Sequence, residues 1–328
     1  MMHRRHLLGA TAGLLAVPAI ASAQSGAWPT RAPVRLVAQF PPGGLVDTIT
    51  RLVAQPLSAA LGQNVIVENR AGAGGVIGTD YVAKQPADGY TFLMTHASVM
   101  VFSAATLPRL PFDPINDFTH LAQLVEAASV ILVRGDSPIR TMADYIARAR
   151  TQPTRYGSSG IGSAPHMLGA MLAGQANLTQ LDHAPYAGSA PAMRDLLGGH
   201  IESLIDPITT NVEAMNNGTL RALAISTPQR LPAFPNVPTF AELGFPTLVQ
   251  TQWVGISGPR GLPAPIAERM MREMPGVMTN ATIVTRTTEL QTMPRNPIPT
   301  GAAFVEIITR ELAAARQVAQ RYNIQVVG

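Results

Sequence analysis

Short apolar runs, each followed by a glycine-containing turn and a helical pattern, recur along this chain of 328 residues. The run Val34–Phe40 leads into the turn Pro41–Gly44, and a helical pattern follows over Val46–Leu61. In the second half of the chain, a run at Arg155–Ser158 leads through a Gly/Ser turn to a helix expected over Ala164–Ala176. Such alternation with short links is typical of an α/β fold with a mainly parallel sheet.

The same alternation continues elsewhere. Further strands are expected at Val65–Glu68, Thr91–Met94, Leu181–Ala184, Ile201–Ile205, Leu220–Ser226 and Thr251–Ser257, and further helices at Thr141–Arg150, Ala190–Leu197, Thr210–Asn217 and Ala302–Arg321. Two apolar runs fill Leu121–Val133, and the proline-rich stretch Pro228–Pro246 is expected to be a connecting loop.

Composition excludes several classes of protein. The 28 Gly and 28 Pro are scattered along the chain, which argues against a coiled coil or helical bundle. The absence of cysteine removes thiolate catalysis, disulfides and thiolate-bound metals. A formal net charge of +4 without a basic block, together with 5% aromatic residues, argues against a nucleic-acid partner. The histidines show no metal-binding spacing, so we expect neither a metal nor a cofactor.

Residues 1–23 have the features of an export signal. Arg4 and Arg5 precede the apolar run Leu7–Ile20, and Ala21-Ser22-Ala23 fits a signal peptidase site. We therefore expect cleavage after Ala23 and a soluble periplasmic protein. The arginine pair resembles a twin-arginine signal, but ordinary export signals also carry two arginines, so both routes stay open.

Two glycine-rich loops follow strands in the first half of the chain. Pro41–Gly44 leaves backbone N–H groups free at a helix start, where anions bind, and Asp47 is expected both to cap that helix and to orient the loop. A tight strand–helix turn with no ligand is the competing interpretation. The second loop, Ala71–Gly78, lacks the glycine spacing of a dinucleotide fingerprint, so we interpret it as structural.

Two more such loops lie in the second half. Tyr156–Ser163 carries three serines at a helix start but breaks the G-x-S-x-G pattern of a hydrolase nucleophile. Ala184–Pro191 again joins a strand to a helix. Both α/β units thus offer amides and hydroxyls suited to holding a carboxylate between two lobes. The alternative function is an exported serine hydrolase that uses Ser159 or Ser163 with His166.

A series of different short motifs is spread through most of the chain after the signal. In order, they are Trp28-Pro29, Phe40-Pro-Pro-Gly-Gly44 with Asp47, Val67-Glu-Asn-Arg70, Ala87-Asp-Gly-Tyr-Thr91, Leu110-Pro-Phe-Asp-Pro114, Pro185-Tyr186 with Gly188, Asp195-Leu-Leu-Gly-Gly199 and Leu220-Arg-Ala-Leu-Ala224. With these motifs the chain resembles the substrate-binding proteins of tripartite tricarboxylate transporters, the TctC or Bordetella uptake gene (Bug) family. The resemblance implies a periplasmic receptor, not an enzyme, which delivers a small organic carboxylate to membrane transporter subunits or signals to a sensor protein.

The resemblance also implies an α/β, two-lobed periplasmic binding-protein fold (type II-like) with two crossings between the lobes. We place the crossings near Ala127–Val133 and Thr247–Gly255. One lobe then comprises residues 24–127 plus 252–328, and the other comprises residues 128–251. Carried over from the family, the ligand-binding residues are Pro42, Gly43, Gly44, Asp47, Ser158, Ser159, Ser163, Tyr186, Gly188, Ser189 and Asp206.

The chain departs from the family pattern at three places. The segment after Thr91 reads Thr95-His-Ala-Ser98, where the family usually has a pair of small residues. Asp206 is followed by Pro207 instead of the commoner Asn, and Pro275–Arg295 matches the usual C-terminal helices poorly. The first two departures leave the ligand open among monocarboxylates, dicarboxylates, tricarboxylates, aromatic acids and acidic amino acids.

Overall fold

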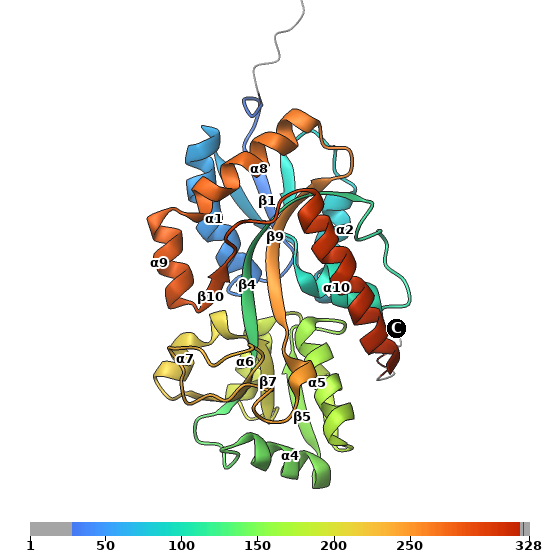
Figure 1. Ribbon diagram of the computed structural model, residues 1–328, viewed down its shortest axis with the longest axis vertical. Coiled ribbons are helices and arrows are strands. Elements are labelled where there is room, and N and C mark those ends of the chain that lie inside the picture. Colours follow the sequence, from blue (N-terminus) through green and yellow to red (C-terminus); the bar gives the residue numbers. More distant parts are fainter. Residues whose placement is uncertain (1–27, 322–323, 325–328) are drawn as a thin grey trace, which may run out of the picture.

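The protein is a mixed α/β structure in which two halves are stacked along the long axis of the molecule (Figure 1). The computed structural model describes residues 28–321 and residue 324. The predicted export signal at residues 1–23 lies outside the described residues.

Strands and helices alternate along most of the described chain. The strands are β1 (Val34–Ala38), β2 (Val65–Asn69), β3 (Thr91–Leu93), β4 (Phe118–Arg134), β5 (Thr154–Ser158), β6 (Leu181–Pro185), β7 (Ser203–Pro207), β8 (Leu220–Ile225), β9 (Thr251–Pro259) and β10 (Thr292–Pro294). The α-helices are α1 (Leu45–Leu61), α2 (Val76–Ala83), α3 (Ala104–Thr106), α4 (Met142–Thr151), α5 (Ala164–Ala176), α6 (Ser189–Leu197), α7 (Val212–Asn216), α8 (Ala264–Met278), α9 (Ala281–Glu289) and α10 (Ala302–Arg321). A π-helical segment, η2, covers Ser98–Ser103.

The described strands form one 10-stranded sheet in the order β2-β1-β3-β9-β4-β7-β5-β6, with β8 and β10 also paired to β4. The pairs β1–β2, β1–β3, β5–β6 and β5–β7 are parallel, whereas every pair that involves β4 or β9 is antiparallel. The expectation of a mainly parallel sheet is therefore wrong. Each half contains a parallel unit, and antiparallel strands join the two units.

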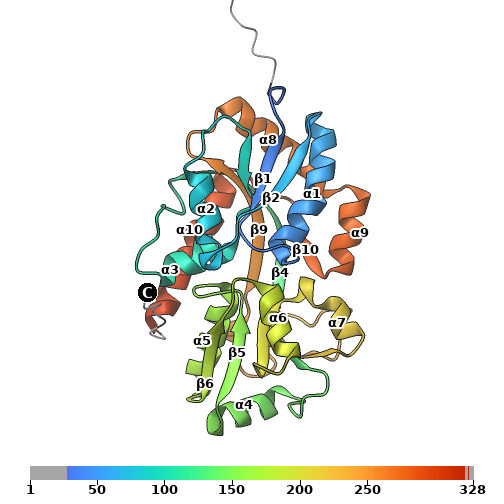
Figure 2. The same cartoon turned by 180° about the vertical axis from the view of Figure 1, so that it is seen from behind.

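Strand β4 runs from one half of the molecule into the other (Figure 1). The sequence suggested two apolar runs over Leu121–Val133, and the structure shows one strand of 17 residues. The strand continues because its pairing passes without a break from β9 to β7, with Ala128 opposite Thr251 and Ser129 opposite Pro207. Helices α1, α2 and α8–α10 surround the upper half, and α4–α7 surround the lower half (Figures 1 and 2).

Local sequence signals explain several helix ends. Thr141 accepts a hydrogen bond from the backbone N–H of Asp144, and the Asp144 carboxylate accepts one from Thr141, which confirms the predicted capping box at α4. Helix α1 ends at Gly62, which adopts the left-handed conformation with a φ of 65°.

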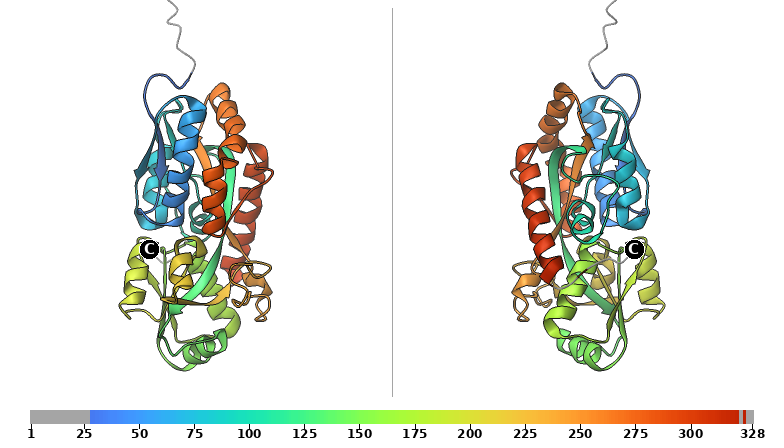
Figure 3. Two further views of the ribbon diagram at one scale, coloured as in Figure 1. Left: turned by 90° about the vertical axis from the view of Figure 1, so that its left-hand side faces the viewer. Right: turned by 90° about the vertical axis from the view of Figure 1, so that its right-hand side faces the viewer.

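In side view, α1 and α10 lie on opposite sides of β4 (Figure 3). The divergent segment Pro275–Arg295 forms the end of α8, then α9 and β10, which pairs with β4.

None of the helices in the described part of the chain is both long enough and apolar enough to cross a bilayer.

Two histidines, His96 and His120, are buried within the fold, and two more, His166 and His183, are half-buried. Burial disfavours the imidazolium form, so the pKa falls to about 3 for His96 and His183 and to about 4 for His120 and His166. Proximity to His166 lowers the pKa of His183 further. Each imidazole is therefore neutral in the folded protein near neutral pH.

These histidines predict that the protein loses stability as the pH falls below the ordinary histidine pKa of about 6.5. Below this pH the unfolded chain binds protons at these histidines and the folded chain does not. The stability that is present above pH 6.5 is therefore lost progressively as the pH falls from 6.5 to the pKa values of the folded protein, about 3 to 4. Burial raises the pKa of Asp206 to about 6, so the folded protein binds one proton there over the same pH range, which opposes the effect of the histidines. Between pH 7.5 and 5.5 we expect the free energy of unfolding in urea to fall by about 3–5 kcal/mol. A flat profile over this range would contradict the assignment of four neutral imidazoles in the folded protein.

Candidate functional site

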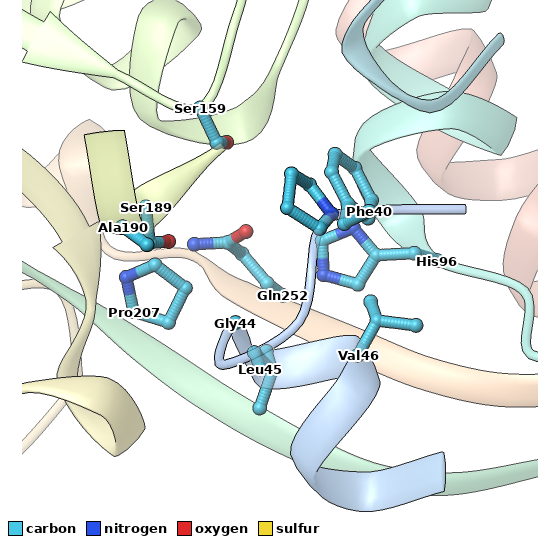
Figure 4. A pocket seen from close by; sticks show the side chains of 11 residues that line it. Phe40, Gly44, Leu45, Val46, His96, Ser159, Ser189, Ala190, Pro207 and Gln252 are labelled. Atoms are coloured by element: carbon cyan, nitrogen blue, oxygen red, sulfur yellow. The ribbon is translucent and has the colours of Figure 1, made fainter. Parts of the chain in front are cut away.

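A pocket lies between the two halves, where loops from both meet near the start of β9 (Figure 4). The volume open to the centre of a water-sized sphere is about 20 Å³, within about 380 Å³ of empty space that includes open solvent. Among the described residues that line it there is no Asp, Glu, Lys or Arg. The lining residues are Phe40, Pro41, Gly44, Leu45, Val46, His96 and Gln252 from the upper half, and Ser159, Ser189, Ala190 and Pro207 from the lower half.

The loop between β1 and α1 is held in place by the carboxylate of Asp47. Its Oδ2 atom accepts a hydrogen bond from the backbone N–H of Gly43 at 2.9 Å, and its Oδ1 atom accepts one from Asn69 at 2.8 Å. Arg51 donates from 3.1 Å to both oxygens. Burial raises the pKa of Asp47, but the hydrogen bonds from Arg51, Gly43 and Asn69 outweigh burial and leave the pKa below its ordinary value. Asp47 is therefore ionised, and it orients the loop instead of capping α1.

Two helices begin at the pocket, one from each half. At the start of α1, the backbone N–H groups of Leu45 and Val46 have no hydrogen-bond acceptor among the described residues. The same holds for Ser189 and Ala190 at the start of α6. The positive ends of two helix dipoles therefore face one small space, from opposite sides.

The predicted serines of the second half divide into two groups. Ser159 and Ser189 line the pocket, and Figure 4 shows the Ser159 side chain directed into it. Ser158 is fully buried behind the pocket, where its Oγ lies 2.6 Å from Nε2 of His183. Ser163 caps α5 by accepting a hydrogen bond from the backbone N–H of His166. Ser158 and Ser163 thus support the loop and do not line the pocket.

The remaining predicted residues also lie around the pocket and not on its surface. The Tyr186 hydroxyl donates to Asp195 at 2.7 Å, and Gly188 lies against Pro41 of the other half. Pro42 and Gly43 are exposed on the first loop, and Asp47 is buried where it bonds to Gly43. Only Gly44, Ser159 and Ser189 of the eleven predicted residues line the pocket.

Asp206 is completely buried behind Ser189. Its carboxylate accepts hydrogen bonds from the hydroxyls of Ser189 at 2.6 Å and Thr210 at 2.8 Å, and from the Asn211 amide at 2.9 Å. Burial raises the pKa of Asp206 to about 6, and the three hydrogen bonds counteract only part of that rise. Because Ser189 donates its proton to Asp206, the Ser189 oxygen faces the pocket as an acceptor.

The sequence interpretation missed His96 and Gln252. His96 follows β3 at the place where the chain departs from the family pattern, and that departure was the available signal. Gln252 is a buried amide near the start of an apolar strand, at 1% exposure. A polar side chain inside such a strand is a signal for a buried polar contact.

The serine–histidine arrangement expected of a hydrolase is not formed by the predicted residues. Nδ1 of His166 accepts a hydrogen bond from the backbone N–H of Gly162 and does not contact a serine hydroxyl. In the pair that does form, Ser158 with His183, the serine is fully buried and does not line the pocket. Among residues 28–321 and 324, no three His, Asp or Glu side chains are grouped so as to hold a metal ion.

Comparisons with known proteins identify the family. The family model described as "Tripartite tricarboxylate transporter family receptor", TctC, matches residues 49–320. The chain belongs to the TctC family. It is 33% identical to Protein BugT of Bordetella pertussis over 287 residues, which cover 86% of this chain and 87% of BugT.

Solved structures of TctC/Bug proteins have the same fold. The periplasmic binding protein BugD is 26% identical, with a TM-score of 0.86 over 90% of this chain and 99% of BugD. A Rhodopseudomonas palustris protein with adipate is 30% identical, with a TM-score of 0.85 over 92% of this chain and 100% of that protein. MatC of R. palustris with bound malate is 27% identical, with a TM-score of 0.83 over 88% of this chain and 99% of MatC. The predicted α/β periplasmic binding-protein fold and the predicted family are both confirmed.

The network around Asp47 predicts a large effect of a single substitution. Asp47→Ala leaves three donors without their acceptor, one of them the backbone N–H of Gly43, and we expect the free energy of unfolding to fall by about 2–3 kcal/mol. Glu289→Ala is the control, since Glu289 forms an exposed pair with Arg286 on α9 and should change stability by less than about 1 kcal/mol. Equal losses for the two variants in urea unfolding would show that Asp47 does not anchor the loop.

Proposed function

We propose that this TctC protein is a periplasmic solute-binding receptor that holds a small organic carboxylate in the pocket between its two halves. It acts by binding and not by catalysis. The receptor delivers its ligand to the membrane subunits of a tripartite tricarboxylate-type transporter, or signals the ligand's presence to a sensor protein. Export by the signal at residues 1–23, with cleavage after Ala23, belongs to this proposal.

The observation that carries the proposal is the meeting of two helix starts at one uncharged pocket. An anion there receives hydrogen bonds from the amides of Leu45 and Val46 on one side and of Ser189 and Ala190 on the other. A carboxylate has two oxygens with several acceptor positions, so one group can engage both helix starts. The malate bound by MatC and the adipate bound by its R. palustris relative support the same ligand class.

Binding tests the site directly. We expect Ser159→Ala to weaken the binding of a small carboxylate by about ten- to a hundredfold, because a hydrogen bond to a charged group contributes about 1.5–3 kcal/mol. Gly44→Val should weaken binding further, since the branched side chain stands in the pocket. Calorimetric titration of the purified variants measures both effects.

The matched control is Arg70→Ala. The Arg70 guanidinium lies 3.5 Å from the ring centre of Tyr81, outside the pocket, so its removal should leave carboxylate affinity nearly unchanged. Loss of binding in Arg70→Ala but not in Ser159→Ala would place the anion on an arginine and refute the proposed site.

The proposal includes closure of two lobes over the ligand, with residues 24–127 plus 252–328 in one lobe and 128–251 in the other. The halves approach closely on both sides of the pocket. A Cβ atom on Gly188 would lie 2.8 Å from Cδ of Pro41, and one on Gly160 would lie 3.2 Å from Cα of Gly74. Such contacts fit a closed state and would separate if the lobes rotated apart.

Small-angle scattering tests closure. We expect the radius of gyration to decrease when a bound carboxylate saturates the wild-type protein. Gly188→Ala should prevent the full decrease and weaken binding, because the added methyl meets Pro41 without straining an extended backbone. Gly276→Ala on α8, where a methyl meets nothing within 4 Å, should behave like wild type. An unchanged wild-type radius at saturation would mean that the site is already closed without ligand.

A further inference from the structure

His96 offers the pocket a hydrogen-bond donor that no other described residue uses. Its Nδ1 accepts the backbone N–H of Ser98 at 3.2 Å, so the ring proton is on Nε2. Nε2 is buried and has no hydrogen-bond partner among the described residues. The whole residue is only 3% exposed and lines the pocket.

The orientation of the His96 ring is fixed by its surroundings. The ring of Phe40 packs edge-on against it, with centroids 5.6 Å apart and an interplanar angle of 82°. The His96 carbonyl accepts the N–H groups of Val99 and Met100, both at 3.1 Å, at the start of η2. Backbone and ring are therefore both held in place before any ligand arrives.

Gln252 supplies the complementary acceptor. Its Nε2 donates to the Ser129 hydroxyl at 2.7 Å, which leaves Oε1 as the free end of the amide. In Figure 4 the Gln252 amide and the His96 ring both reach into the space above Gly44. The Ser189 oxygen, whose proton goes to Asp206, is a second acceptor in the same pocket.

We infer that His96 and Gln252 form a neutral donor–acceptor pair that selects a hydroxyl group, so that the ligand is a hydroxycarboxylate. This inference rests on the proposed function, because the helix starts hold the carboxylate while the pair holds the hydroxyl. The hydroxyl oxygen accepts from Nε2 of His96, and the hydroxyl proton goes to Oε1 of Gln252.

Other common substituents satisfy only half of this pair. An ammonium group has no lone pair for the His96 N–H, and the described residues of the lining include no Asp or Glu to neutralise it. A second carboxylate accepts from His96 but has no proton for Gln252. A ligand that leaves a buried polar group unpaired loses affinity, which is how a site built around a hydroxyl discriminates against analogues that lack it.

The experiment is calorimetric titration of the mature protein with three matched pairs of acids: lactate and propionate, 3-hydroxybutyrate and butyrate, and malate and succinate. We expect the hydroxy acid of at least one pair to bind about tenfold more tightly or better than its partner. His96→Phe and Gln252→Met should each reduce that ratio to below threefold while changing the affinity for the acid without the hydroxyl by less than about threefold. Gln250→Met, the same change two residues earlier and outside the pocket, should keep the wild-type ratio.

A spectroscopic measurement separates hydrogen bonding from mere packing. In nitrogen-15 NMR spectra of the histidine side chains, His96 should show a protonated Nε2 and an unprotonated Nδ1, and the Nε2 signal should shift with the hydroxy acid more than with its partner. Equal affinities within every pair, as expected if a water fills the hydroxyl position, would overturn the inference while leaving carboxylate binding intact. The opposite tautomer of His96 would overturn it in the same way. If none of the six acids bound, the proposed function and the inference would fail together.

Discussion

The pocket depends on the uninterrupted pairing of β4 with strands of both halves. Gln252 lies opposite Ala127 of this strand, and Pro207 lies opposite Ser129, so two pocket residues are paired to β4 where its partner changes. The hydrogen bond from Gln252 to Ser129 crosses the same place. One strand thus sets the position of the pocket floor, while the loops above it belong to different halves of the molecule.

An anion site built from helix starts differs physically from one built from arginine. Each helix start contributes the equivalent of about half a positive charge through oriented N–H groups, and no charged side chain has to be desolvated when the pocket closes. The charged groups of the region lie behind the loops and are already partnered, Asp47 with Arg51 and Asn69, and Asp206 with three donors. They shape the loops without competing for the ligand.

Local patterns in the sequence predicted the elements that depend on neighbouring residues, and they failed where contact between distant segments decides. The bounds of α5 and α10 match their expected ranges, because apolar periodicity and capping residues are local signals. Gly44, Ser159 and Ser189 line the pocket, and each lies in, or directly after, a loop that follows a strand, which is the signal that the sequence offered. Ser158 is turned away from the pocket because it ends β5, where its hydroxyl bonds to His183 on the neighbouring strand. Tyr186 does not line the pocket, and its hydroxyl donates to Asp195, nine residues later. No motif shows that the buried Nε2 of His96 lacks a partner or that Gln252 lines the pocket, so both residues needed the packed structure.

In the receptor proposed above, the unpaired Nε2 of His96 would couple ligand binding to lobe closure. A buried donor without an acceptor costs about 1–3 kcal/mol relative to the same group in water. The closed, ligand-free pocket bears that cost, and an open pocket relieves it by admitting water to the imidazole. A ligand oxygen relieves it as well, but only while the lobes stay closed around the ligand. Under the proposed closure, the same unpaired group would therefore favour opening of the ligand-free protein and closure of the occupied one. A neutral imidazole, fixed in one tautomer by Ser98, would do so without a charge to bury.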